Sequence, residues 1–66
     1  MEIVYATKKV NSINTISCHI EQTFNDNYSI IVFDEEGGIW IEKYAQTLKD
    51  AEIIAEKLFN EVINNY

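Results

Sequence analysis

The sequence predicts an α+β fold, in which a three- to four-stranded antiparallel β-meander is followed by one C-terminal amphipathic α-helix packed on one face of the sheet. Three observations support this prediction. Residues 13–24 alternate between apolar and polar, residues 30–42 place two apolar runs around an acidic, glycine-containing turn, and the residues from Leu48 onward follow a helical period. The chain has 66 residues, no proline and no linker, so we expect a single domain with a small core.

Four strands are expected, over residues 2–6, 13–24, 28–34 and 39–45, with residues 8–12 connecting the first two. In the first strand Ile3 and Tyr5 point one way and Val4 the other. In the second, one side carries Ile16, Cys18, Ile20 and Phe24, and the other carries Thr15, Ser17, His19, Glu21 and Thr23. A hairpin is expected at residues 25–27, since Asn and Asp tolerate turn conformations.

The third and fourth strands are joined by residues 34–38. Paired glycines supply the positive φ angles that a tight connection needs, and the carboxylates are expected to keep this turn in water. In the third strand, Ile31 and Phe33 lie opposite Tyr28, Ile30 and Val32; in the fourth, Trp40, Glu42 and Tyr44 lie opposite Ile39 and Ile41.

A helix is expected over residues 48–64. Thr47, followed by Asp50, nearly matches a capping box, with Asp in place of Glu. The apolar positions spread over about half of the helix circumference, which is wider than one sheet contact requires and indicates a second contact. Ile53 lies outside even this wide face.

The charge balance limits the classes of partner. Eleven acidic residues face five lysines, arginine is absent, and the net charge is -6. Because arginine is the preferred residue for bidentate phosphate and guanine contacts, direct nucleic-acid binding is disfavoured, as is binding to anionic membranes. A protein with a basic surface is the favoured partner. No targeting segment or membrane span is recognised, so a cytoplasmic location is expected, in the host cytoplasm if the protein is phage-encoded.

No set of residues predicts catalysis or a metal or cofactor site. Cys18 and His19 are neighbours in the chain, but successive side chains of a strand point to opposite faces, so the thiol and imidazole cannot form a nucleophile–base pair. Ser17, His19 and Glu21 would be parallel rather than convergent. The lone cysteine excludes an internal disulfide, and the acidic turn lacks the spacing of a calcium loop. We therefore expect a non-enzymatic protein without cofactors.

One helix can cover only one face of the sheet, so the second face must find another cover. The residues expected to mediate self-association are Ile31, Phe33, Trp40, Tyr44 and Ile53. Three covers are considered: residues 10–17 of the same chain, a second copy in a twofold homodimer, or a heterologous partner.

The leading hypothesis is a small acidic interaction protein, a homodimer, that binds and modulates or inhibits another protein. In its sharper form it is a phage-type counter-defence inhibitor or nucleic-acid mimic, whose partner-binding residues are Asp34, Glu35, Glu36, Glu52, Glu56 and Glu61. The alternatives are an uncharacterised structural domain or a small nucleic-acid-binding or regulatory module. Residues 42–58, EKYAQTLKDAEIIAEKL, resemble the sheet-then-helix ending of integrase arm-binding domains, which implies DNA binding, although those domains are basic and this chain is acidic.

Overall fold

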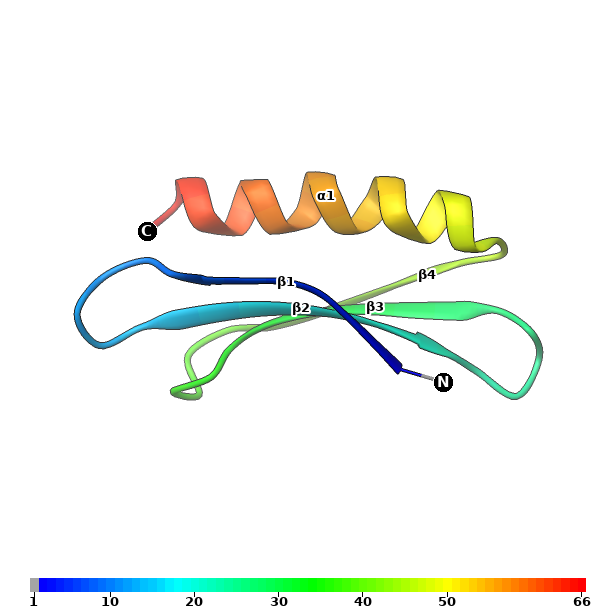
Figure 1. Ribbon diagram of the computed structural model, residues 1–66, viewed down its shortest axis with the longest axis horizontal. Helices are drawn as coiled ribbons and strands as arrows, with labels where there is room; N and C mark the ends of the chain where they lie inside the picture. Colours follow the sequence, from blue (N-terminus) through cyan, green and yellow to red (C-terminus); the bar gives the residue numbers. More distant parts are fainter. Residues whose placement is uncertain (1) are drawn as a thin grey trace.

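The computed structural model describes residues 2–66 and contains one sheet and one helix. The elements are β1 (Glu2–Lys9), β2 (Thr15–Gln22), β3 (Tyr28–Asp34), β4 (Trp40–Ala45) and α1 (Leu48–Asn64). All neighbouring strands are antiparallel in the order β1-β2-β3-β4, and α1 lies along one face of the twisted sheet (Figure 1). The predicted α+β meander with a C-terminal helix is confirmed, with four strands.

The core lies between the sheet and α1. From the sheet it contains Ile16, Cys18, Ile20, Ile30 and Val32, and from the helix Ala51, Ala55, Leu58, Phe59 and Val62. The register pairs Cys18 with Val32 and Ile20 with Ile30, so branched side chains of the two central strands lie side by side. Ala51 and Ala55 are fully buried, and their small side chains let the helix approach the sheet closely.

The helix begins and ends at sequence-specified positions. Thr47 has an extended backbone, and its hydroxyl accepts a hydrogen bond from the Asp50 backbone N–H at 3.1 Å, as the capping pattern predicts. At the other end, the Asn65 side chain donates to the Glu61 carbonyl at 2.9 Å. Both ends of α1 therefore have side-chain caps.

The wide apolar face of α1 is used within the chain itself. The helix contacts all four strands, so its two flanks as well as its centre meet the sheet. Leu48, Ile54 and Ile63 are partly buried against the core, and Ile53 remains exposed. The sheet therefore accounts for much of the wide apolar face, and a second contact of α1 stays a prediction.

Four strand boundaries differ from expectation, and two of them are starts: β2 begins at Thr15 rather than at residue 13, and β4 begins at Trp40 rather than at residue 39. β1 extends to Lys9, with a bulge between Val4 and Ala6, so residues 8 and 9 belong to the strand rather than to the connection. β2 ends at Gln22, and Phe24 is fully exposed in the following turn instead of sharing the core face. The Thr23 N–H bonds the Asn27 carbonyl at 2.8 Å and Asp26 has φ 60°, so the hairpin closes before Phe24 can extend the strand.

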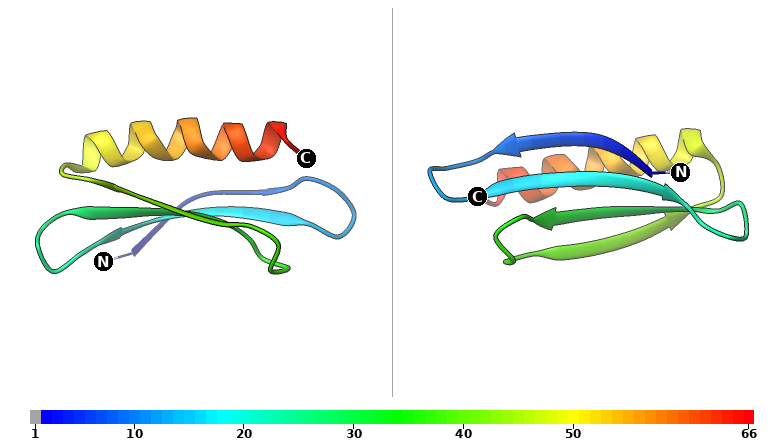
Figure 2. Two further views of the ribbon diagram at one scale, coloured as in Figure 1. Left: turned by 180° about the vertical axis from the view of Figure 1, so that it is seen from behind. Right: turned by 60° about the horizontal axis from the view of Figure 1, so that its bottom comes forward.

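Residues 10–17 do not cover the second face of the sheet. The Val10 N–H bonds the Asn14 carbonyl at 3.0 Å, which closes a tight connection, and Val10 packs against the core rather than beyond it. The Asn11 side chain accepts hydrogen bonds from the N–H groups of Ile13 and Asn14, so the segment is satisfied locally. This proposed cover is therefore wrong, and the sheet presents an uncovered face (Figure 2, right).

Candidate functional site: the open face of the sheet

The sheet surface opposite α1 is formed by alternate residues of all four strands, and we call it the open face. Strand pairing arranges its side chains in three rows across the sheet: Thr7, Ser17, Phe33, Trp40; then Val4, His19, Ile31, Glu42; then Glu2, Glu21, Ser29, Tyr44. Trp40 and Tyr44 are 66% and 65% exposed. Exposed aromatic side chains of this size are characteristic of binding surfaces.

Three rings on the open face contact one another in the order His19, Phe33, Trp40. The His19 and Phe33 ring centroids are 5.1 Å apart with an interplanar angle of 79°, an edge-to-face contact. The Phe33 and Trp40 centroids are 5.4 Å apart with an angle of 33°. These contacts restrict the rotation of the three side chains in the free chain. Rings that are already ordered lose less side-chain entropy when a surface is bound.

The charged groups of the open face are mostly acidic. Glu2, Glu21 and Glu42 project from it, whereas Lys9 lies near one corner by its pairing with Thr15. His19 lies 3.5 Å from the Glu2 carboxylate, between Nδ1 and Oε2. Glu42 raises the pKa of the Tyr44 hydroxyl, first by hydrogen bonding and then through its negative charge, with a further contribution from burial. An aromatic surface with an acidic rim is the result.

The two edge strands are poor sites for adding another strand. β1 carries the bulge between Val4 and Ala6, and β4 is short, with Glu42 and Lys43 at its middle. Bulges and charged residues are the features by which natural sheets block edge-to-edge pairing. Both edge strands therefore carry features that disfavour pairing with a further strand.

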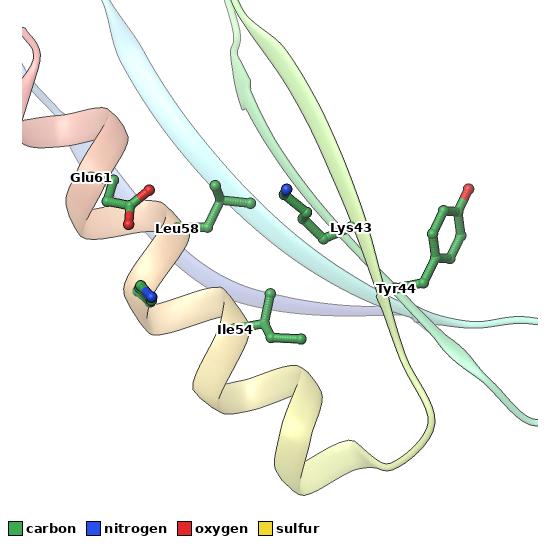
Figure 3. A pocket seen from close by; sticks show the side chains of 6 residues that line it. Lys43, Tyr44, Ile54, Leu58 and Glu61 are labelled. Atoms are coloured by element: carbon green, nitrogen blue, oxygen red, sulfur yellow. The ribbon is translucent and has the colours of Figure 1, made fainter.

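A shallow groove of about 290 Å³ runs between β4 and α1 on the other side of the sheet. Ile54 and Leu58 form its apolar part, with Lys43, Lys57 and Glu61 around it. Figure 3 shows the Tyr44 ring pointing away from the helix, on the opposite side of β4 from Leu58. The groove and the open face thus lie on opposite sides of β4, and Tyr44 is the residue that belongs to both.

The acidic turn is exposed to solvent from Glu35 to Gly38, as its composition predicts, but the carboxylate of Asp34, which ends β3, is not. Asp34 is only 5% exposed, and its carboxylate accepts hydrogen bonds from Asn14 Nδ2 at 2.9 Å, Tyr66 Oη at 3.0 Å and the Glu36 backbone N–H at 2.9 Å. The Glu36 N–H contributes most to lowering the Asp34 pKa, and burial opposes it. Asp34 therefore ties three segments together and is poorly placed to contact a partner.

Both glycines of this turn have structural roles. Gly37 has φ 94°, a conformation that disfavours other residues. A Cβ atom on Gly38 would lie 2.9 Å from Asp34 Oδ2, so the carboxylate occupies the space that a side chain would need. Gly37 therefore allows the turn conformation, and Gly38 leaves space for the buried Asp34 carboxylate.

The six acidic residues expected to bind a partner do not form one patch. Glu35 accepts a hydrogen bond from the buried Ser17 hydroxyl, and Glu36 accepts one from the Thr15 backbone N–H at 2.7 Å. Glu52 and Glu56 are exposed one turn apart on α1, whereas Glu61 lines the groove beside β4 on the other flank of the helix. The chain therefore presents no single acidic strip.

The four sheet residues expected to mediate self-association do lie together on the open face: Ile31, Phe33, Trp40 and Tyr44. Ile53 does not join them, because it is exposed on α1, beyond the opposite face of the sheet. Sequence reasoning omitted Val4, His19 and Glu42 from this surface. The alternation of their strands is the signal that identifies them, since it places each on the same side as its neighbours in the rows.

Cys18 and His19, the neighbouring thiol and imidazole, lie on opposite faces of the sheet. Cys18 lies in the core and His19 on the open face, as strand alternation predicts. Burial raises the pKa of the Cys18 thiol to about 11, so the thiol is protonated at neutral pH. Within residues 2–66, no three His, Cys, Asp or Glu side chains gather in a way that could hold a metal ion.

The described residues include no helix with the length and apolarity needed to cross a membrane. Comparisons with protein-family models, with curated proteins and with solved structures find no match to this chain.

Proposed function

We propose that this chain is a small acidic interaction protein, without catalytic activity or cofactor, that binds another protein and thereby modulates or inhibits it. The observation that supports this proposal is the open face, where Trp40 and Tyr44 are two-thirds exposed beside an ordered row of rings. Trp and Tyr are the residues most enriched at the centres of protein interfaces.

The size of the open face fits a small protein interface. Four strands about 4.8 Å apart and about 20 Å long span about 400 Å², about half of what a standard interface buries on one partner and within the range of transient complexes. Such a surface also suits a second copy of the chain. Self-association as a twofold homodimer through the open face is therefore the second candidate, supported by the protected edge strands.

The test is a pull-down from the native host with single substitutions. Trp40→Ser and Tyr44→Ser are expected to abolish retention of the partner, because each removes a large exposed ring from the open face. Ile53→Ser, which removes a similarly exposed apolar side chain from α1, is the matched control and is expected to retain the partner. Equal retention by all four proteins, wild type included, would contradict the assignment of the surface.

Self-association is measured separately by sedimentation velocity at several protein concentrations. A concentration-dependent dimer that disappears in Trp40→Ser and persists in Ile53→Ser would place the second copy on the open face. A strict monomer at all concentrations would exclude the homodimer and leave the heterologous partner.

A further inference from the structure

The exposed side of β4 carries an alternating set of aromatic and acidic side chains. Trp40, Glu42 and Tyr44 all belong to the open face, and we call them the β4 triplet. Alternate residues of a strand are spaced by about 7 Å, so the carboxylate lies between two aromatic rings. A planar cation that stacks on one ring can therefore reach the carboxylate with its N–H groups.

The surroundings of the β4 triplet favour such an ion. Phe33 pairs with Trp40 and holds its ring at 5.4 Å, while Ile31 pairs with Glu42 on its inner side. Glu42 is exposed, so its carboxylate is accessible to a cation, and a partner that covers the apolar neighbours strengthens the attraction by excluding water. Among residues 2–66, the one contact within 4 Å between a basic side chain and a carboxylate joins His19 to Glu2. Glu42 therefore has no basic side chain beside it in this part of the chain.

From this geometry we infer that the β4 triplet binds an arginine side chain from a basic segment of a different protein. The guanidinium group stacks on Trp40 and donates hydrogen bonds to the Glu42 carboxylate. Arginine fits better than lysine because its planar fork both stacks on rings and pairs with carboxylates through two parallel hydrogen bonds. This inference rests on the proposed function and names the chemistry of the partner.

A second copy of the chain is a poorer occupant of the β4 triplet. The sequence contains no arginine, so another copy cannot supply the guanidinium group. Pairing two open faces would also place Glu2, Glu21 and Glu42 of both copies within one interface, with Lys9 as the one lysine that residues 2–66 place on that face of each copy. Like charges brought together at an interface are unfavourable, whereas a basic partner is attracted by the net charge of -6.

The test uses the intrinsic fluorescence of Trp40, which is the single tryptophan of the chain and therefore reports from the site. The probe is an arginine hexapeptide with blocked termini, compared with the citrulline hexapeptide, which keeps the shape and loses the charge. Titration with the arginine peptide is expected to shift Trp40 emission saturably, and the citrulline peptide is expected to bind about tenfold more weakly.

Glu42→Gln and Glu56→Gln each remove one negative charge and keep Trp40. Glu42→Gln is expected to weaken binding of the arginine peptide about tenfold, and Glu56→Gln less than twofold, since its exposed carboxylate on α1 acts only through the screened net charge. If both variants bind the arginine peptide equally weakly, the effect is due to net charge alone and the inference is overturned. Equal binding of both peptides would also overturn it.

The outcome is distinguishable from that of the proposed function. If Trp40→Ser abolishes partner retention in the pull-down while Glu42→Gln has no effect there or in the titration, the open face stands as the interface and arginine recognition fails. If a concentration-dependent dimer forms and the arginine peptide does not disturb it, a second copy occupies the face and the inference is wrong.

Discussion

At the scale of single residues, Asp34 shows how a side chain that is usually at the surface becomes part of the framework. Its position two residues after Val32 gives it the parity of the core face, so the strand directs its carboxylate inward. Three donors from Asn14, Glu36 and Tyr66 then satisfy it, and the part of the chain described here has no buried side-chain nitrogen or oxygen left without a hydrogen bond. The arrangement links the sheet end to the C-terminal residue.

The hydrogen bonds to Asp34 predict a specific acid sensitivity. Because they lower its pKa below 3.8 in the folded protein, Asp34 contributes stability above that pH and loses it as the pH falls through the folded value. We therefore expect the melting temperature, measured from pH 7 to pH 2, to fall more steeply below about pH 4 for the wild type than for Asp34→Asn.

Asp26→Asn is the matched control, since Asn accepts the positive φ at position 26. Its unfolding profile below pH 4 should follow the wild type. Identical profiles for all three proteins would contradict the linkage of Asp34 to the fold.

Cys18 gives a second prediction at this scale. Full burial and a pKa of about 11 should make the thiol unreactive toward a disulfide reagent such as DTNB at pH 8, and reaction should appear only when urea unfolds the chain. Rapid reaction of the native protein would show that the sheet opens away from α1 easily.

At the scale of elements, the helix depends on its own cap and on the sheet beneath it. An isolated helix of 17 residues is marginal in water, so α1 gains most of its stability from the alanine and leucine face that it packs on the sheet. The Thr47 cap adds a local contribution that does not involve the core. The two contributions can be separated by substitution.

Thr47→Ala should lower the free energy of unfolding by about 1 kcal/mol, because the Asp50 N–H loses its acceptor. Thr47→Ser keeps the hydroxyl and should lie within a few tenths of a kcal/mol of the wild type. Urea unfolding followed by circular dichroism measures both. A similar decrease in the free energy of unfolding in both variants would show that the threonine methyl group, rather than the hydroxyl cap, stabilises the helix.

At the scale of the whole molecule, the core and the proposed binding surface lie on opposite faces of one sheet. The face toward α1 carries the buried aliphatic residues, and the open face carries the exposed rings. A domain of this size buries a limited share of its surface, so leaving Trp40 and Tyr44 in solvent forgoes burial that the fold could otherwise use. Such an arrangement is expected when a surface is retained for binding.

The division predicts opposite effects of two substitutions. Ile30→Ala should lower the free energy of unfolding by about 2–5 kcal/mol, since Ile30 is fully buried between β2 and α1. Trp40→Ser should cost only about 1 kcal/mol, the scale of its contact with Phe33, while abolishing partner binding. Thermal unfolding and the pull-down, run on the same samples, measure the two effects. A large stability loss in Trp40→Ser would assign the ring to the fold instead.

The sequence alone determined the local features: the strand alternation, the helical period from Leu48, the Thr47 cap and the separation of Cys18 from His19. Each is set by a residue and its near neighbours, so periodicity is sufficient to predict it. The same periodicity predicted that Ile31, Phe33, Trp40 and Tyr44 share one side, but it did not say which side α1 would cover.

Only the tertiary structure decided that choice, because it depends on the summed packing of residues far apart in the chain. Ile16, Ile30 and Val32 meet the small alanines of α1, which leaves the larger rings outside. It also decided how the inward-pointing Asp34 carboxylate is satisfied, since two of its three donors, Asn14 and Tyr66, lie 20 and 32 residues away. Long-range contacts of this kind leave no periodic trace in the sequence, so the sequence could not show which of the two faces would keep its rings exposed.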